Sequence, residues 1–160
     1  MAAEVSVTIE GLTQLEAGLA DAPATLASAT RRQMDAASLL IEGTARTLAP
    51  QDRRILAGSI TYAISGSGGN LTSRIGPSVL YGLPVERGTR GPRRPPPVAA
   101  LAGWAARHGV NAFLLARAIG RRGTKGKPYM EPALDKHKRD VDRLMSDIGV
   151  TVVSTIARGG

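Results

Sequence analysis

The sequence of 160 residues contains no cysteine and few aromatic residues. Without cysteine the chain forms neither a disulfide scaffold nor a thiolate zinc site, and it has no cysteine nucleophile. Aromatic residues make up 3% of the chain, although 42% of its residues are hydrophobic. A core of this composition consists mainly of Ala, Leu, Ile and Val. The length predicts a single domain over residues 1–160.

Long apolar runs are also missing. Residues 1–10 contain acids and no continuous apolar stretch, which argues against a signal peptide. No run approaches the roughly 18 apolar residues of a membrane-spanning helix. We therefore expect a protein without membrane contact that folds in a reducing cytoplasm.

Positive charge is abundant, and much of it lies in one segment. The formal net charge is +8. Ten of the 21 basic residues but only one of the 13 acidic residues, Glu86, lie in residues 86–127, which leaves eleven basic and twelve acidic residues elsewhere. Such a segment favours a polyanion or an acidic protein surface as partner, with a merely solvated basic face as the alternative. The expected partner-binding residues are Arg87, Arg90, Arg93, Arg94, Arg121, Arg122, Lys125 and Lys127.

Hydrophobic spacing predicts the elements of the first half of the chain. Val5, Val7 and Ile9 alternate with polar residues and predict a short strand. Helical spacing up to Pro23 is followed by a longer pattern from Leu26, which predicts the main helix, ending before Pro50. Alternation then predicts a β-hairpin, with strands around residues 60–64 and 71–75 joined by a glycine-rich turn at 66–70, and extended structure again at 79–81.

The second half is predicted to be mainly helical. Residues 88–97 contain two glycines and four prolines and are expected to form an irregular exposed loop. Two short helices, over 98–108 and 111–122, form a helical hairpin around Gly109, and a basic turn follows at 120–128. A final helix has its apolar face on Met130, Leu134, His137, Val141, Leu144, Met145 and Ile148, and Val150, Val152 and Val153 predict a last strand. The expected fold is α+β, with a small antiparallel sheet packed against a long N-terminal helix and a C-terminal helix, and an inserted loop and helical hairpin at about 87–127.

The sequence offers no catalytic, metal-binding or cofactor-binding set. His108 and His137 lie in different predicted elements, and neither has a second ligand at the i, i+4 spacing that a metal site on one helix would need. Residues 120–127 lack the glycine and Lys-Ser/Thr positions of a phosphate loop, and the glycines at 66–69 are explained by a hairpin turn. We therefore expect a protein that is not an enzyme and has no cofactor.

The helical hairpin over 98–122 suggests a second class of function, a helix-turn-helix DNA-binding protein. A recognition helix carries polar side chains near its N-terminus, whereas this one offers Asn111 and then Ala112, Phe113, Leu114 and Leu115. These apolar residues predict a helix that is built for packing. Arg117, Arg121 and Arg122 lie at the far end of the helix, where they suit phosphate or an acidic surface better than base edges.

Four short motifs occur in a characteristic order along the chain. They are Val7-Thr8-Ile9-Glu10-Gly11-Leu12; Ala49-Pro50-Gln51-Asp52 with Leu56 and Ser59-Ile60; Tyr81 with Val85-Glu86-Arg87-Gly88-Thr89; and Lys127-Pro128-Tyr129-Met130-Glu131-Pro132-Ala133-Leu134. In this order and at this length the chain resembles the small head-tail joining or tail-completion proteins of the neck of long-tailed bacteriophages and prophages. Members of that family usually carry Thr-Gly after the Pro-x-Asp motif, where this chain has Arg53-Arg54.

The resemblance implies a structural virion protein made in the cytoplasm of the bacterial host. Such a protomer assembles as a homo-oligomeric ring at the junction of tail and head, in contact with the tail terminator or tube and with the head connector. A channel lining that makes non-specific contact with passing DNA is a further reading. Because attraction to phosphates would hinder transit, acidic protein partners rank above DNA.

The motif residues also have structural readings of their own. The residues to which the resemblance assigns structural roles are Pro50, Asp52, Tyr81, Glu86, Gly88, Thr89, Pro128, Tyr129, Pro132 and Ala133. Gly88 permits a positive φ where a strand leaves the sheet, and Thr89 hydrogen-bonds the turn. Pro128 fixes the approach to the last helix, where Tyr129 packs its ring and keeps its hydroxyl in water, and Pro132 is tolerated in the first turn.

Overall fold

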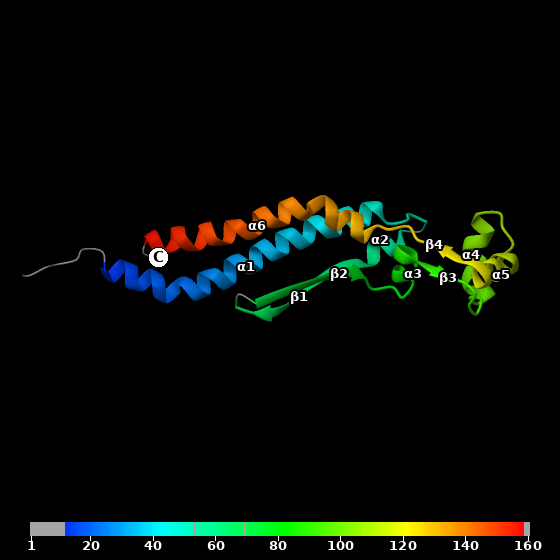
Figure 1. Cartoon of the computed structure of the whole chain (residues 1–160), viewed down its shortest axis with the longest axis horizontal. Coiled ribbons are helices and arrows are strands. Elements are labelled where there is room, and N and C mark those ends of the chain that lie inside the picture. Colours follow the sequence, from blue (N-terminus) through cyan, green and yellow to red (C-terminus); the bar gives the residue numbers. More distant parts are fainter. Residues whose placement is uncertain (1–11, 53, 69, 159–160) are drawn as a thin grey trace, which may run out of the picture. The chain divides into compact units, whose positions relative to one another are not determined.

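The computed structural model describes residues 12–52, 54–68 and 70–158 (Figure 1). The fold class is α+β, as the sequence predicts, with a long N-terminal helix, a C-terminal helix packed against it and two small antiparallel sheets. Contacts divide the chain into two compact units. The helical unit contains the residues up to 43, residues 62–75 and those from 134 onward; the motif unit contains residues 44–61 and 76–133. The strand predicted at Val5–Ile9 lies outside the described residues.

Two long helices dominate the helical unit. Helix α1 spans Leu12–Leu48 and helix α6 spans Met130–Arg158, and the final residues of α1 and the first of α6 belong to the motif unit. The buried residues of α1 recur at helical spacing, at Ala29, Ala37, Ile41 and Ala45. Near the other end of the pair the two backbones approach closely, because a Cβ on Gly18 would lie 2.9 Å from the carbonyl oxygen of Ile156.

Three sequence predictions about these helices are wrong. The helical pattern is one continuous helix that includes Pro23, because loss of one hydrogen bond is outweighed by packing on both sides of the proline. Val150, Val152 and Val153 continue α6 to Arg158 and form no strand, since tertiary context overrides their β-propensity. Leu134 is 47% exposed, and the buried residue at the start of α6 is its neighbour Ala133.

The predicted β-hairpin is confirmed. Strand β1 spans Ile60–Ser67, strand β2 spans Asn70–Pro77, and Gly66 and Gly68 adopt positive φ angles near the turn. The hairpin is joined to α1 by polar contacts. The hydroxyls of Ser38 and Ser73 lie 2.6 Å apart, and the hydroxyl of Tyr62 donates to Asp35 Oδ1 at 3.3 Å.

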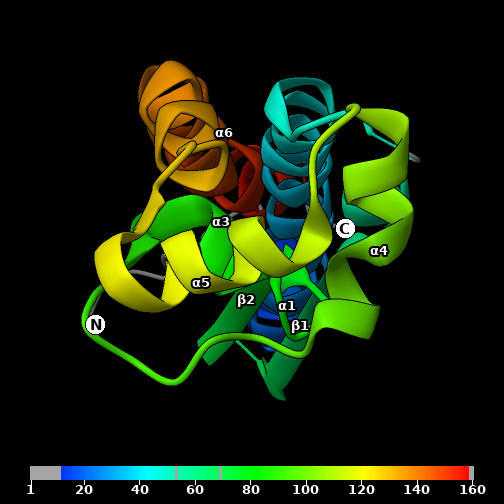
Figure 2. The same ribbon diagram turned by 90° about the vertical axis from the view of Figure 1, so that its right-hand side faces the viewer.

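The motif unit contains the remaining short elements. They are helices α2 (Ile55–Ser59), α3 (Gly82–Arg87), α4 (Val98–Arg107) and α5 (Ala112–Arg122), and strands β3 (Gly88–Arg90) and β4 (Gly123–Lys125). Strands β3 and β4 are antiparallel, with Thr89 opposite Thr124. The predicted helical hairpin is confirmed as α4 and α5, which run in clearly different directions (Figure 2).

The short strands and α3 correct three further predictions. Extended structure at 79–81 is wrong, because Tyr81 has helical dihedral angles and precedes α3. The segments 88–97 and 120–128 are not wholly irregular, because their ends pair as β3 and β4. Strands of three residues rich in glycine, threonine and basic side chains carry no hydrophobic alternation from which they could be predicted.

Candidate interaction surface

The motif that contains Glu86 meets the motif that begins α6. The carboxylate of Glu86, at the end of α3, accepts hydrogen bonds from the backbone N–H groups of Tyr129, Met130 and Glu131, at 2.7, 3.0 and 3.2 Å. The N–H of Lys127 also donates to the carbonyl oxygen of Val85. A carboxylate at this place satisfies N–H groups that have no partner within the helix and favours the positive end of the helix dipole. Glu86 is therefore a helix cap, a role that the sequence analysis did not assign.

Tyr129 is a core residue of the motif unit. Its side chain is only 1% exposed, and its hydroxyl donates to the carbonyl oxygen of Gly82 at 3.2 Å. The prediction that this hydroxyl stays in water is therefore wrong, because α3 supplies a backbone acceptor 47 residues away in sequence. Burial, followed by the nearby charge of Glu86, raises the pKa of Tyr129 above its ordinary value.

Gly88 and Thr89 join the motif to the inserted segment. Gly88 has φ 73°, which confirms the expected positive dihedral, although the residue ends α3 and begins β3 and does not lie at the exit from a larger sheet. The hydroxyl of Thr89 lies 3.0 Å from that of Thr124 and accepts a hydrogen bond from the Thr124 N–H. The β3–β4 ribbon thus forms the base of the segment 91–122, and a further bond from the N–H of Arg93 to the carbonyl oxygen of Gly120 follows it.

Asp52, in the segment that follows α1, contacts the helical hairpin formed by α4 and α5. Its carboxylate accepts two hydrogen bonds from the guanidinium of Arg107 on α4, through Nε and Nη2. His108 stacks on Trp104, with ring centroids 4.1 Å apart. Pro50 follows the end of α1 as predicted, Pro132 lies in the first turn of α6, and Pro128 and Tyr81 are exposed. The motif residues therefore make up the framework that holds the hairpin.

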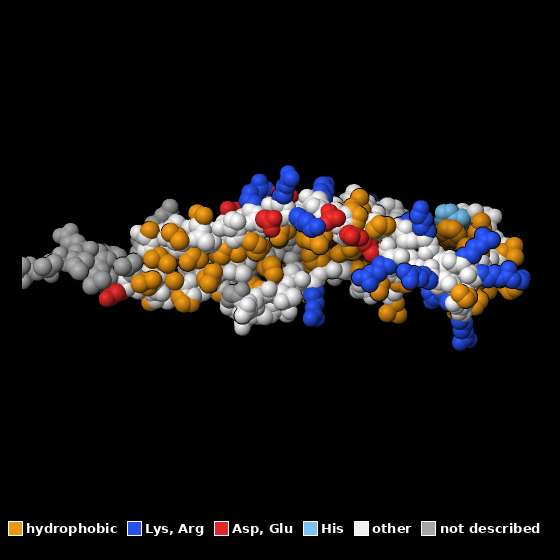
Figure 3. All heavy atoms as spheres, in the orientation of Figure 1, with side chains coloured by type: hydrophobic (Ala, Val, Ile, Leu, Met, Phe, Trp, Pro, Cys, Tyr) orange, Lys and Arg blue, Asp and Glu red, His pale blue; other side chains and the backbone are white. Residues whose placement is uncertain are grey.

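The eight predicted partner-binding side chains are all exposed. None of them forms an ion pair with another described residue, and all belong to the motif unit. Figure 3 shows basic side chains projecting around α4 and α5, with hydrophobic side chains among them. They are Arg87, Arg90, Arg93, Arg94, Arg121, Arg122, Lys125 and Lys127. Exposed cationic side chains that form no ion pair within the described chain make a surface suited to an anionic partner.

The first turn of α5 carries exposed apolar side chains that the sequence analysis expected to pack. Phe113 is 60% exposed and Leu114 is 61% exposed. Trp104, near the end of α4, and Val110, in the α4–α5 connection, are also exposed. We call these four residues the apolar tip. The predicted packing role is wrong for Phe113 and Leu114, because the hairpin buries only Ala105, Ala116 and Gly120 and offers nothing that covers its first α5 turn.

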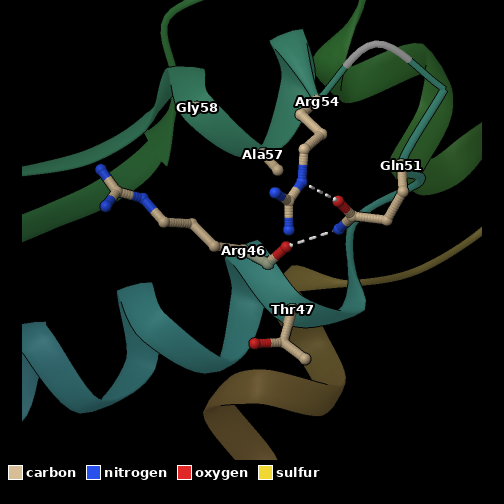
Figure 4. A pocket seen from close by; sticks show the side chains of 6 residues that line it. All are labelled: Arg46, Thr47, Gln51, Arg54, Ala57 and Gly58. Atoms are coloured by element: carbon tan, nitrogen blue, oxygen red, sulfur yellow. Dashed lines mark hydrogen bonds between the residues drawn. The ribbon is translucent and has the colours of Figure 1, made fainter.

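An open pocket of about 630 Å³ lies between the end of α1 and α2, and no sequence motif predicts it. It is lined by Arg46, Thr47, Gln51, Arg54, Ala57 and Gly58 (Figure 4). The Nε of Arg54 donates to Gln51 Oε1, whereas Arg46 donates to the carbonyl oxygen of Ile60. The two guanidinium groups point in different directions, so they do not converge on one anion.

Arg54 itself has an unusual backbone. Its φ of 58° and ψ of 7° place it in the left-handed region, where glycine is the favoured residue. In the phage proteins that the sequence resembles, glycine is the usual residue at this position. The left-handed turn is therefore formed here by an arginine, at a conformational cost of about 1 kcal/mol.

The two histidines have separate local partners. His137 Nδ1 lies 2.9 Å from Asp140 Oδ2, one turn along α6. This hydrogen bond lowers the pKa of Asp140 against the opposing effect of burial. Within the described parts of the chain, no three acidic or histidine side chains gather as metal ligands would. None of the helices there is long and apolar enough to cross a membrane.

No family model, curated protein or solved structure matches this chain. Function therefore has to be argued from the motif residues and from the surface just described.

Proposed function

We propose that this chain is a head-tail joining or tail-completion protein of a long-tailed bacteriophage or prophage. In this proposal it acts without catalysis, as a ring of identical subunits at the junction of the tail with the head connector. Its partners are the neighbouring subunits and the tail and head proteins on either side. The basic residues of the 87–127 segment contact acidic surfaces of those proteins.

One observation supports the proposal most directly. Two of the motifs that carry the resemblance, separated by about 40 residues of sequence, are joined by the hydrogen bonds between Glu86 and the start of α6. Asp52 of the second motif adds the bond to Arg107. The motif residues thus behave as a structural framework, while the segment between them presents charge. This division suits a protein that functions by binding other proteins in a fixed arrangement and not by catalysing a reaction.

The alternative of a sequence-reading helix-turn-helix protein has less support. The side chain of Asn111 accepts hydrogen bonds from the N–H groups of Phe113 and Leu114, so its oxygen serves as a helix cap. The exposed residues of the first turn are apolar, whereas base edges in the major groove are read by hydrogen-bonding groups. Non-specific attraction to phosphates remains consistent with the basic side chains.

Disruption of the gene in the phage or prophage that carries it tests the proposal. We expect lysates with separate full heads and separate tails in electron micrographs, and joined particles again when the wild-type gene is supplied in trans. Arg93→Glu with Arg94→Glu reverses the charge at two exposed positions and is expected to fold normally but to restore few joined particles. Conversion of the same arginines to Lys is the matched control. Joined, infectious particles at normal numbers without the gene would defeat the proposal.

A further inference from the structure

The apolar tip combines large exposed side chains with a fixed backbone. Asn111 holds the first turn of α5 by accepting the Phe113 N–H at 2.9 Å and the Leu114 N–H at 3.1 Å. Single exposed apolar residues are ordinary, but clusters of large ones mark interaction sites on soluble proteins. Here four such residues lie at or beside one helix connection, and Phe113 and Leu114 each expose about three fifths of their surface.

The hairpin that carries the tip is held at several points. Arg107 is bonded to Asp52, Trp104 is stacked on His108, and the Arg93 N–H is bonded to the carbonyl oxygen of Gly120. A side chain presented on such a support loses little freedom when it docks. Pre-organisation of this kind lowers the entropic cost of association.

The charge around the tip indicates what kind of partner fits it. Helix α5 continues from Phe113 and Leu114 to exposed Arg117, Arg121 and Arg122, and no acidic residue occurs between residues 87 and 127. A complementary surface therefore has an apolar centre and a rim of carboxylates. A second copy of this chain is a weak complement, since the sequence outside 86–127 contains eleven basic and twelve acidic residues and so has a net charge of only −1.

We propose that the apolar tip inserts into an apolar pocket bordered by carboxylates on a different protein, with Phe113 and Leu114 as the main anchors. Arg117 and Arg121 pair with the carboxylates at the edge of that pocket. This inference rests on the proposed function, in which the partner is one of the proteins on either side of the ring. DNA is a poorer fit, because burial of Phe113 and Leu114 there requires unstacking of base pairs.

The test uses heads and tails collected from a lysate of the gene-disrupted phage. Purified full-length protein is added, and joined particles are counted by plaque titre and electron microscopy. Wild-type protein is expected to restore joining, and Phe113→Ala with Leu114→Ala is expected to restore at least tenfold less, as for truncation of interface anchors. Val98→Ala, an exposed apolar position at the other end of α4, is the matched control and is expected to remain within twofold of wild type.

A second variant tests the charged rim and does not alter the tip. Arg117→Glu with Arg121→Glu is expected to lose joining to a similar extent. Circular dichroism verifies that both double variants are folded. Folding is expected because the side chains of Phe113, Leu114, Arg117 and Arg121 are all exposed. Binding of each protein to a 30-base-pair duplex at physiological salt is measured in parallel.

The outcomes separate the two proposals. If wild-type protein restores joining and the Phe113/Leu114 double variant does so equally well, the tip is not an anchor, and the proposed function stands alone. If wild-type protein restores nothing, both proposals are wrong. If the double variant loses tenfold or more in duplex binding and nothing in joining, the tip is a nucleic-acid contact.

Discussion

Loss of the Glu86 carboxylate is expected to destabilise the motif unit more than loss of any other single acidic side chain in it. Glu86 accepts three backbone N–H groups at the start of α6, of which those of Tyr129 and Met130 are partly buried. A hydrogen bond to a charged acceptor contributes about 1.5–3 kcal/mol, and one partly buried N–H left without an acceptor costs about as much. Because the bonds share one side chain, we expect Glu86→Ala to lower the free energy of unfolding by about 2–4 kcal/mol.

Glu86→Gln keeps one oxygen of the same reach, which can replace Oε2 as the acceptor for the N–H groups of Tyr129 and Met130. It loses the negative charge at the helix end and the bond from the exposed Glu131 N–H to Oε1, which together correspond to about 1–2 kcal/mol. Glu131→Gln, in the same first turn but exposed, is the matched control and is expected to change stability by no more than about 0.5 kcal/mol. Urea unfolding followed by Trp104 fluorescence and by circular dichroism gives the three values. A loss below about 0.5 kcal/mol for Glu86→Ala, or an equal loss for Glu131→Gln, would refute the capping argument.

Three further predictions concern stability. Gly18→Ala is expected to lower the melting temperature, because a Cβ would lie 2.9 Å from a backbone oxygen of Ile156. Gly43→Ala, also in α1 but with open space for a Cβ, is expected to raise stability by about 0.5–1 kcal/mol. Stability changes of the same sign for both variants would contradict the packing of α1 on α6. Arg54→Gly is expected to be about 1 kcal/mol more stable than Arg54→Ala in urea unfolding, since only glycine adopts the positive φ of this residue without strain. Equal free energies of unfolding for the two variants would show that this backbone is not strained. Burial raises the pKa of Tyr129 in the folded state, so the phenol ionises first in the unfolded chain, and the free energy of unfolding falls as pH rises above about 10.0. Tyr129→Phe is expected to reduce this fall of the unfolding free energy with pH. An unchanged pH dependence would count against the buried hydroxyl.

The elements with a clear hydrophobic period could be predicted from the sequence. Tyr62 and Ile64 alternate with exposed residues, and β1 and β2 form where that alternation indicates. Gly109 separates α4 from α5 as expected, with φ 65° and Asn111 as the cap of the second helix. In both cases the signal is local, because side chains within one element decide which face is buried.

The contacts that build the candidate site are not local, and the sequence did not indicate them. Glu86 meets Met130 across 44 residues, and Tyr129 meets Gly82 across 47 residues. Neither pair has a spacing that a helix or strand period could reveal. Phe113 and Leu114 were misjudged for the opposite reason, since apolar residues on a helix predict burial and nothing in the sequence shows that the covering surface is missing.

Backbone contacts at the base of the inserted segment hold it in place independently of its exposed basic side chains. A Cβ on Gly123 would collide with the carbonyl oxygen of Thr89, and one on Gly88 with that of Thr124, so both strands of the ribbon approach at glycines with positive φ. These backbone contacts, with the Asp52–Arg107 pair, position the segment without the side chains of the eight exposed cations that are predicted to bind partners. Replacement of those cations therefore changes what the surface attracts and leaves the framework intact, whereas replacement of Gly88 or Gly123 displaces the whole segment.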